Sequence, residues 1–199
     1  YPDCKFSTIV DSEIIIDNVD LHASKNKTSL SVFLDVNNGM NRTGVTPDNK
    51  AIDLYMKIES KKSLIANGLH VYDGHIRHSN FDLRKNECDR DFKKVEKLIK
   101  NLKNLNVHVK NVVAGGTPTF PIHSKRKNVQ VSPGTPLLWD ERYGGMFKDL
   151  DFSPAAVLFG RLVSKPQSNL LCFNLGHKSV AAEMDFPRLK ILNYNATKQ

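Results

Sequence analysis

The chain has 199 residues, of which 40% are hydrophobic and 25% are charged, and its net charge is +8. This is the composition of an ordinary globular protein with enough residues for a sizeable core. No apolar run reaches the roughly 20 residues of a membrane helix, and the first residues, YPDCKFS, lack the pattern of a signal peptide. We therefore expect a cytoplasmic protein that contacts no membrane.

The positive charge is spread along the chain rather than clustered. Only HSKRKN (residues 123–128) forms a basic cluster, whereas most lysines alternate with apolar positions in helical stretches. That pattern is typical of a solvated helix face, while nucleic-acid binding requires clustered cations. We expect no nucleic-acid partner.

The three cysteines, Cys4, Cys88 and Cys172, are far apart and show neither CxxC nor Cys/His spacing. Such a pattern predicts free thiols rather than disulfides or a zinc site.

Apolar runs that predict strands alternate with amphipathic stretches that predict helices. The strand runs occupy residues 6–10, 30–36, 68–74, 107–116 and 128–134, and the helical stretches occupy residues 12–25, 48–66 and 87–105. The last of these helices has one apolar stripe opposite a lysine-rich face. Two strand runs are apolar enough to be buried on both faces, as parallel strands are.

Polar and glycine residues follow four of the five predicted strands in this part of the chain, at residues 35–43, 72–75, 115–117 and 132–135. A doubly wound sheet usually concentrates its site at one switch point, whereas a barrel spreads its site around one rim. We therefore predict an α/β fold, a (β/α)8 TIM barrel of which about five strand-helix units lie in residues 1–150.

The pattern changes in residues 151–199. Residues 153–166 and 169–184 are strand-like and are separated by the turn PQSN, and a further strand-like run covers residues 186–195. No helix is predicted between them. We interpret this region as the beginning of an antiparallel C-terminal β-domain.

The motif GGTPT (residues 115–119) suggests a phosphate cradle, because glycines let backbone N–H groups approach an anion and Thr117 and Thr119 add hydroxyl donors. The alternative is a tight turn in which the threonines act as caps. The next strand end, SPGT (residues 132–135), repeats this chemistry. Two neighbouring cradles favour a ligand that carries phosphate.

Two further side chains come from strand ends. Arg42 lies in NNGMNRTG, where a sharp turn could present it to a ligand oxygen, or it could pair with Asp35. Tyr72 alternates with His70 along its strand, so its ring points either into the barrel mouth or into the core.

Five segments together resemble a known family: VFLDVNNGMNRTGV, GLHVYDGHI, VVAGGTPTFPIH, SPGTPLLWDERYG and LGHKSVAAE. In this order and spacing they resemble the D-threonine aldolase and D-serine dehydratase family of fold-type III pyridoxal-phosphate enzymes. The N-terminal domain of that family is the alanine-racemase-type barrel. The resemblance covers nearly the whole chain.

The resemblance implies roles for particular residues. Arg42 matches an arginine that contacts the pyridoxal ring oxygen, and Tyr72 matches a tyrosine stacked near the ring or bonded to its nitrogen. Segments that hold the phosphate of pyridoxal 5'-phosphate match Gly116 with Thr117, and Gly134 with Thr135.

Three histidines stand near these motifs. We predict that His75 and His177 lie near the substrate, while His123 is a weaker candidate. For each of them the alternative is a structural role, such as a hydrogen bond to a backbone carbonyl.

The resemblance also implies parts that this sequence does not match. No lysine here has the context of the family's Schiff-base lysine, which we expect upstream of Tyr1, so we predict no catalytic residue in the chain. We expect a divalent metal to be bound by residues beyond Gln199. Asn174 stands where the family more often has an aspartate.

The function implied is a pyridoxal-phosphate-dependent D-amino-acid lyase of D-threonine aldolase type, which cleaves a β-hydroxy D-amino acid by a retro-aldol reaction. An amino-acid racemase or a D-serine dehydratase of the same fold is the alternative within the family. A non-catalytic protein that binds pyridoxal phosphate or another phosphorylated ligand is the alternative from another class. We expect a small D-amino acid as substrate and a homodimer as the assembly.

Overall fold

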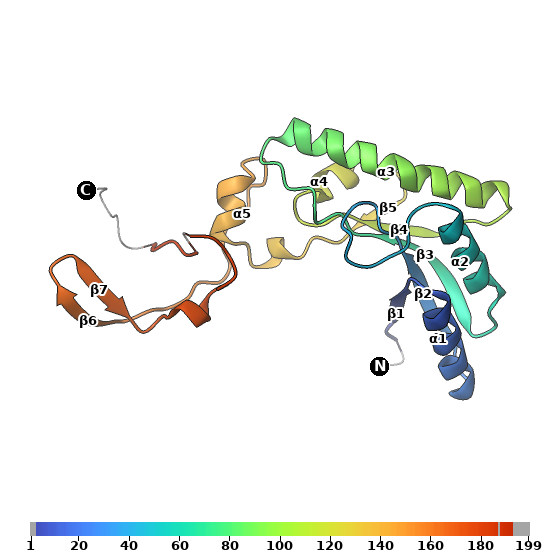
Figure 1. Ribbon diagram of the computed structural model, residues 1–199, viewed down its shortest axis with the longest axis horizontal. Helices are drawn as coiled ribbons and strands as arrows, with labels where there is room; N and C mark the ends of the chain where they lie inside the picture. Colours follow the sequence, from blue (N-terminus) through green and yellow to red (C-terminus); the bar gives the residue numbers. More distant parts are fainter. Residues whose placement is uncertain (1–2, 187, 193–199) are drawn as a thin grey trace. The chain divides into compact units, whose positions relative to one another are not determined.

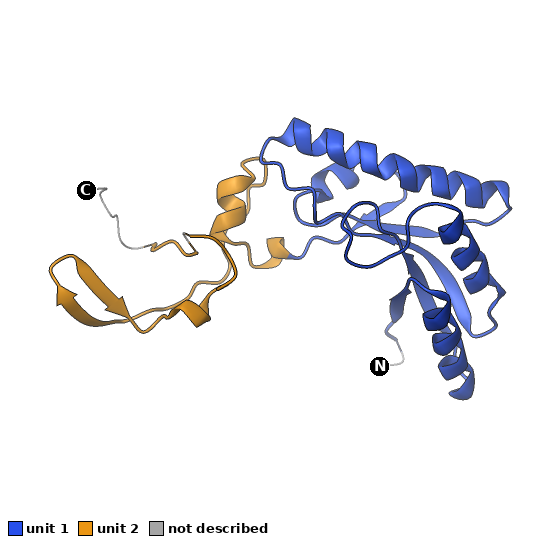
Figure 2. Ribbon diagram, in the orientation of Figure 1, with its two compact units in different colours: residues 1–134 blue, residues 135–199 orange. Residues whose placement is uncertain are grey.

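The structure is a computed structural model that describes residues 3–186 and 188–192. The chain divides into two compact units, Tyr1–Gly134 and Thr135–Gln199 (Figure 2). We predicted a domain boundary after residue 150. It stays a prediction, because a division into compact units does not by itself define domains.

The first unit is a parallel sheet of five strands whose spatial order, β1-β2-β3-β4-β5, is also their order in the chain (Figure 1). The strands are β1 (Ser7–Val10), β2 (Leu30–Asp35), β3 (Leu64–Val71), β4 (Asn111–Ala114) and β5 (Val129–Val131). The connecting helices are α1 (Glu13–Lys25), α2 (Asn49–Ser60), α3 (Phe81–Asn104) and α4 (Phe120–His123). Consecutive parallel strands with helical crossovers are the repeating unit of a β/α barrel. This confirms the predicted fold class, with part of the barrel present.

One apolar layer joins the sheet to the helices. Alternate strand residues such as Val32, Leu34 and Leu69 pack against helix residues such as Leu54 and Leu98, and all five are buried. The buried apolar residues recur every second position in the strands and every third or fourth position in the helices, as the sequence predicts. The helices therefore cover one face of the sheet.

The opposite face of the sheet carries polar side chains beside apolar ones such as Phe33 and Ile65. The Asn111 side-chain amide donates to Asn67 Oδ1 at 2.7 Å, and Gln130 donates to Asn111 Oδ1 at 3.2 Å. On the neighbouring pair of strands, the His70 ring contacts Asp35 at 2.7 Å. In a barrel this face lines the interior.

Local signals fix the helix ends. The side chains of Ser12, Asp48 and Asn80 each accept a backbone hydrogen bond from the first turn of the helix that follows. The last turn of α3 closes when Asn106 takes a left-handed conformation, with φ of 59°. This places the Val107 N–H on the Leu102 carbonyl at 3.0 Å, as in a Schellman motif.

Several predicted boundaries are wrong. The predicted helix over 48–66 ends at Ser60, and residues 64–66 instead begin β3, which pairs with β2 from Leu64 onward. Helix α3 begins at Phe81, earlier than predicted, because Asn80 caps it. The short helices α4 and α5 (Glu141–Met146) were not predicted as helices.

The second unit contains an antiparallel pair, β6 (Leu162–Gln167) and β7 (Leu170–Phe173). This agrees with the predicted start of a β-region, although both strands are shorter than the runs 153–166 and 169–184. The turn is Ser168-Asn169 rather than PQSN. The predicted run 186–195 lies partly outside the described residues, and its described part contains no strand.

Within the described part of the chain, no helix combines the length and the apolar character of a membrane span. The cytoplasmic location stays a prediction.

Candidate functional site

All five strands of the first unit end at the same edge of the sheet, because they are parallel. Five connections leave this carboxyl edge: residues 11–12 after β1, 36–48 after β2, 72–80 after β3, 115–119 after β4 and 132–134 after β5. These connections contain the predicted residues Arg42, Tyr72, Gly116 and Gly134. In β/α barrels the functional site lies at this edge.

Arg42 lies over the face of Tyr72, with its guanidinium carbon 4.8 Å from the ring centroid. This is a cation-π contact between two neighbouring strand ends. Arg42 is exposed and Tyr72 is half-buried. The stack therefore joins two residues that the family resemblance assigns to the same ligand.

Arg42 does not form an ion pair with Asp35, whose carboxylate instead contacts His70. Burial opposes the ionisation of Asp35, but hydrogen bonds from His70 and Thr43 and the charges of His70 and Arg42 outweigh it. The pKa of Asp35 is therefore lowered. Asp35 thus adds negative charge beneath the Arg42 loop.

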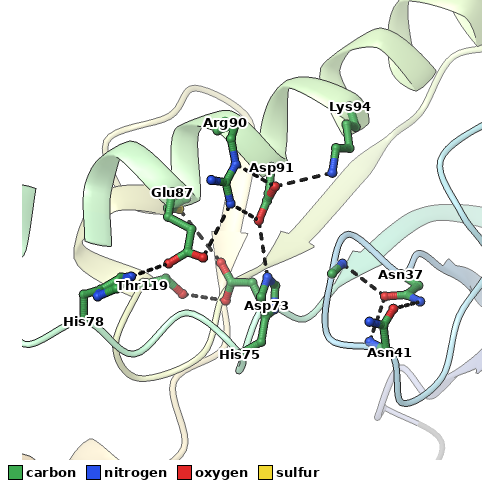
Figure 3. Close-up of polar contacts among 12 residues, drawn as sticks. Asn37, Asn41, Asp73, His75, His78, Glu87, Arg90, Asp91, Lys94 and Thr119 are labelled. Atoms are coloured by element: carbon green, nitrogen blue, oxygen red, sulfur yellow. Dashed lines mark hydrogen bonds and ion pairs between the residues drawn. The ribbon is translucent and has the colours of Figure 1, made fainter. Parts of the chain in front are cut away.

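The loop that presents Arg42 is organised by the side chain of Asn37 (Figure 3). Asn37 Oδ1 accepts from the Gly39 N–H at 3.1 Å and from the Asn41 N–H at 3.0 Å, and its amide donates to Asn41 Oδ1 at 3.1 Å. The loop is closed at its far end where Gly44 N–H donates to Asp11 Oδ2 at 3.1 Å. Asn37 therefore fixes the turn that carries Arg42.

Glycines make room for the Tyr72 ring. A Cβ atom added at Gly116 would lie 2.9 Å from Tyr72 Cε2, and one added at Gly74 would lie 2.3 Å from the Tyr72 hydroxyl oxygen. The ring therefore packs directly on the backbone of the β4 connection. This close approach links Tyr72 to the predicted phosphate segment.

The donors of the GGTPT segment are partly used within the protein. The Gly116 N–H and the Thr119 hydroxyl both donate to Asp73 Oδ1, at 3.1 and 2.6 Å. Thr119 is completely buried, so its hydroxyl is a structural donor rather than the ligand donor that we predicted. Thr117 is 5% exposed, so only a small part of it is open at this edge.

Asp73, Thr119, Cys88 and His123 form a buried group that we call the Asp73 cluster. His123 Nε2 lies 2.9 Å from Asp73 Oδ2 and 3.2 Å from Cys88 Sγ. Because a carboxylate has no proton to donate, the contact with Asp73 places a proton on His123 Nε2. Burial, reinforced by the charge of Asp73, raises the pKa of Cys88 to about 12. Cys88 therefore remains a neutral thiol rather than a nucleophile.

Three members of the Asp73 cluster are metal-ligand types. One ligand atom from each of Asp73, Cys88 and His123 lies within 4.8 Å of the others. The sequence pattern does not reveal this set, because Asp73 follows β3, Cys88 lies in α3 and His123 ends α4, without the short spacing of a metal motif.

His75 lies at the same edge, with its ring against Gly39, where an added Cβ would be 2.5 Å from His75 Nε2. Its Nε2 contacts Asp91 Oδ2 at 3.3 Å (Figure 3). Its Nδ1 is buried and has no partner among the described residues. The predicted position of His75 beside a substrate stays a prediction.

The remaining predicted residues come from the end of the first unit and from the second unit. Gly134 is exposed, and an added Cβ there would have no heavy atom within 4 Å. Thr135 begins the second compact unit, and so the two members of that predicted phosphate segment belong to different units. His177 also belongs to the second unit, where its Nδ1 contacts Arg188 Nη1 at 2.6 Å. Their roles at the site stay predictions.

Parallel β/α units whose connections gather an arginine, a tyrosine and a glycine-threonine segment at the carboxyl edge define a β/α-barrel protein, in which that edge is the candidate ligand site. The chain belongs to the family described as alanine racemase, N-terminal domain, whose model matches residues 2–140. Membership confirms the predicted family.

Three relatives illustrate the match. A 3-hydroxy-D-aspartate aldolase from Paracoccus denitrificans (strain Pd 1222) is 25% identical over 116 residues, which are 58% of this chain and 30% of that protein. The crystal structure of D-threonine aldolase from Filomicrobium marinum has a TM-score of 0.83 and 23% identity over 89% of this chain and 49% of that one. D-threo-3-hydroxyaspartate dehydratase from Delftia sp. HT23 has a TM-score of 0.59 and 16% identity over 66% and 35%. The chain thus spans less than half the length of each.

Proposed function

We propose that this chain is the cofactor-binding part of a pyridoxal-phosphate-dependent D-amino-acid lyase of D-threonine aldolase type. The observation that carries the proposal is the stack of Arg42 on Tyr72 beside Gly116 at the carboxyl edge of the sheet. The identity shared with a 3-hydroxy-D-aspartate aldolase supports the aldolase type.

The residues at this edge fit the chemistry of pyridoxal 5'-phosphate. Arg42 is a permanently charged donor for the ring oxygen, and the Tyr72 ring offers a flat apolar surface. Because Gly116 has no Cβ, the Tyr72 ring lies directly against the main chain, and a planar ligand on Tyr72 would lie close to the Gly116–Thr117 turn. Thr117 follows in the same turn.

Each of these residues has a role in binding rather than in bond breaking. Arg42 orients the ring through its oxygen, Tyr72 packs on the ring or contacts its nitrogen, and two segments hold the phosphate, Gly116 with Thr117 and Gly134 with Thr135. The cofactor, when bound, accepts the electrons released as a bond at the substrate α- or β-carbon breaks. His75 and His177 complete the proposal as residues near the substrate.

The whole protein's activity is a proposal as well, because the chain covers only part of its relatives. We propose a β-hydroxy D-amino acid as substrate and a homodimer as the assembly. The Schiff-base lysine and a divalent metal would come from residues outside this chain.

Cofactor titration tests the binding part of the proposal. Absorbance spectra of the full-length protein, which would include the Schiff-base lysine, are expected to show a band with pyridoxal 5'-phosphate that borohydride removes. Arg42→Ala and Thr117→Ala should each weaken the cofactor affinity by about tenfold or more, equivalent to about 1.4 kcal/mol. Arg142→Ala, at an exposed arginine of α5, is the matched control. Unchanged affinity in both site variants would refute the site.

Product analysis tests the reaction. With D-threonine, a retro-aldol lyase releases glycine and acetaldehyde in equal amounts. A dehydratase acting on D-serine instead releases pyruvate and ammonia, and a racemase produces the L-enantiomer without cleavage. Cofactor binding with none of these products would favour the non-catalytic alternative.

A further inference from the structure

Asp73 is the common acceptor for the segment that follows β4. Its Oδ1 accepts from the Gly116 N–H at 3.1 Å and from the Thr119 hydroxyl at 2.6 Å (Figure 3). Its Oδ2 lies 2.9 Å from His123 Nε2, at the end of α4. One carboxylate from the β3 connection therefore holds the beginning, the middle and the end of residues 116–123.

These contacts are shielded from water. Asp73 is 1% exposed, and Thr119 and His123 are completely buried. Hydrogen bonds to a carboxylate are among the stronger ones in proteins, and a low dielectric strengthens them further. Breaking one of them leaves a buried polar group without a partner, which costs more than the bond contributes. The segment is therefore held rigidly.

Two other contacts hold the same segment. The Arg84 side chain, which is fully buried, donates from Nε to the Pro118 carbonyl at 2.8 Å. Gly115 has φ of +86°, and a Cβ added there would lie 2.9 Å from His123 Cδ2. The imidazole of His123 thus packs directly on the first glycine while it contacts Asp73.

A zinc ion is the alternative explanation for this cluster. The distances are 2.9 Å between His123 and Asp73, 3.2 Å between His123 and Cys88, and 3.9 Å between Cys88 and Asp73. These separations suit three ligand atoms that each lie about 2.0–2.3 Å from one ion. A metal-bound histidine almost always donates its second N–H to an acceptor. Here His123 Nδ1 has no partner among the described residues. The direct hydrogen bonds to Asp73 therefore account for the cluster better than a metal does.

We propose that Asp73 and His123 are positioning residues for phosphate binding, which rests on the proposed cofactor site. Asp73 fixes Gly116 and Thr119, the residues on either side of Thr117 and Pro118, so that Thr117 is ordered before the phosphate arrives. The carboxylate itself is buried and its oxygens are engaged. It therefore orders the donors without presenting its charge to the anion.

The test separates the phosphate from the rest of the cofactor. Dissociation constants are measured for pyridoxal 5'-phosphate and for pyridoxal, which lacks the phosphate, in the purified protein and in Thr119→Val and Asp73→Asn. Valine has the shape of threonine without the hydroxyl, so this variant removes one donor to Asp73. Ser124→Ala is the matched control, because Ser124 is exposed and directly follows His123.

We expect Thr119→Val to weaken pyridoxal 5'-phosphate binding about tenfold and pyridoxal binding less than twofold. Asp73→Asn should act in the same direction, because its amide nitrogen only donates and so cannot accept the hydrogen bond from His123 Nε2. Should Asp73→Asn fail to fold, Thr119→Val carries the test alone.

Three results would count against these conclusions, and they can be told apart. A wild-type protein that binds pyridoxal as tightly as pyridoxal 5'-phosphate refutes the proposed phosphate site. A wild-type protein that prefers the phosphorylated form, with the same preference in both variants, refutes the positioning role alone. If the wild type binds one equivalent of zinc, and Cys88→Ser loses it while Cys172→Ser keeps it, then the Asp73 cluster is a metal site rather than a hydrogen-bonded group.

Discussion

The guanidinium group of Arg42 lies 4.8 Å from the centre of the Tyr72 ring, and the same ring touches the backbone of Gly116. Three connections of the barrel, from β2, β3 and β4, therefore meet around one aromatic side chain. Such an arrangement couples the residues, since a displacement of Tyr72 changes the position of both neighbours. The consequences can be measured one residue at a time.

Gly116→Ala should displace the Tyr72 ring, because the new Cβ would lie 2.9 Å from Tyr72 Cε2. We expect a loss of about 1–3 kcal/mol in the free energy of unfolding, as for other overpacked sites. Affinity for pyridoxal 5'-phosphate should fall about tenfold. Urea unfolding and cofactor titration measure the two effects.

Gly145→Ala is the control for this substitution, since an added Cβ there meets nothing within 4 Å and the position lies in helix α5. That variant should be as stable as the wild type or slightly more stable. If Gly116→Ala also matched the wild type in both measurements, the close contact with Tyr72 would not exist in solution.

Asn37→Ala should loosen the Arg42 loop, because Asn37 Oδ1 accepts from the backbone of Gly39 and Asn41. Each lost hydrogen bond costs about 0.5–1.5 kcal/mol. We expect faster amide exchange at Gly39 and Asn41, measured by hydrogen-deuterium exchange, together with weaker cofactor binding. Asn49→Ala, at an exposed asparagine, should leave both unchanged. Equal exchange in the wild type and in Asn37→Ala would contradict the assigned role.

The sequence predicted the fold class because the information for it is local. The apolar runs at residues 6–10 and 30–36, and the stripe of α3, identify strands and a helix without knowledge of the tertiary structure. Residues 61–66 were assigned to a helix, since their side chains suit either state. Pairing of Leu64 with Leu30 decides for a strand, and such pairing depends on distant residues.

The site was predictable only in part, for a similar reason. Glycine and threonine at strand ends drew attention to Gly116 and Thr117, but nothing in the local pattern distinguished Thr119 from them. Its hydroxyl is used by Asp73, 46 positions earlier in the chain. Asp73 itself lies in the segment Tyr72-Asp73-Gly74-His75, whose unusual polarity was the available signal.

Arg84→Met should destabilise the protein by about 3 kcal/mol, because it removes charge-assisted hydrogen bonds and leaves buried carbonyls without a donor. Arg84 Nε donates to the Pro118 carbonyl at 2.8 Å, and Nη1 donates to the His78 carbonyl at 2.7 Å. Urea unfolding measures the change. Lys85→Met is the matched control, because Lys85 is exposed and its pair with Asp89 is a surface ion pair worth at most about 0.5 kcal/mol. A similar loss in both variants would mean that Arg84 acts only through its charge.

Cys88 should make stability depend on alkaline pH, because burial and then the charge of Asp73 raise its pKa from 9.0 to about 12. Between these values the unfolded chain releases the thiol proton while the folded chain retains it. The stabilisation is thus complete below about pH 9 and declines as the pH rises toward 12, by at most about 1.4 kcal/mol per pH unit. Cys88→Ser removes this titration, so its free energy of unfolding should fall less steeply between pH 9 and 11.

The measurement compares urea unfolding at several pH values for the wild type, Cys88→Ser and Cys172→Ser. Cys172 is exposed, so its variant should follow the wild type. Alkylation at pH 8 adds an independent observation, since a buried neutral thiol should react only after unfolding. Parallel pH profiles for all three proteins, with Cys88 alkylated in the folded state, would show that the thiol is neither buried nor perturbed, and that the Asp73 cluster is open to water.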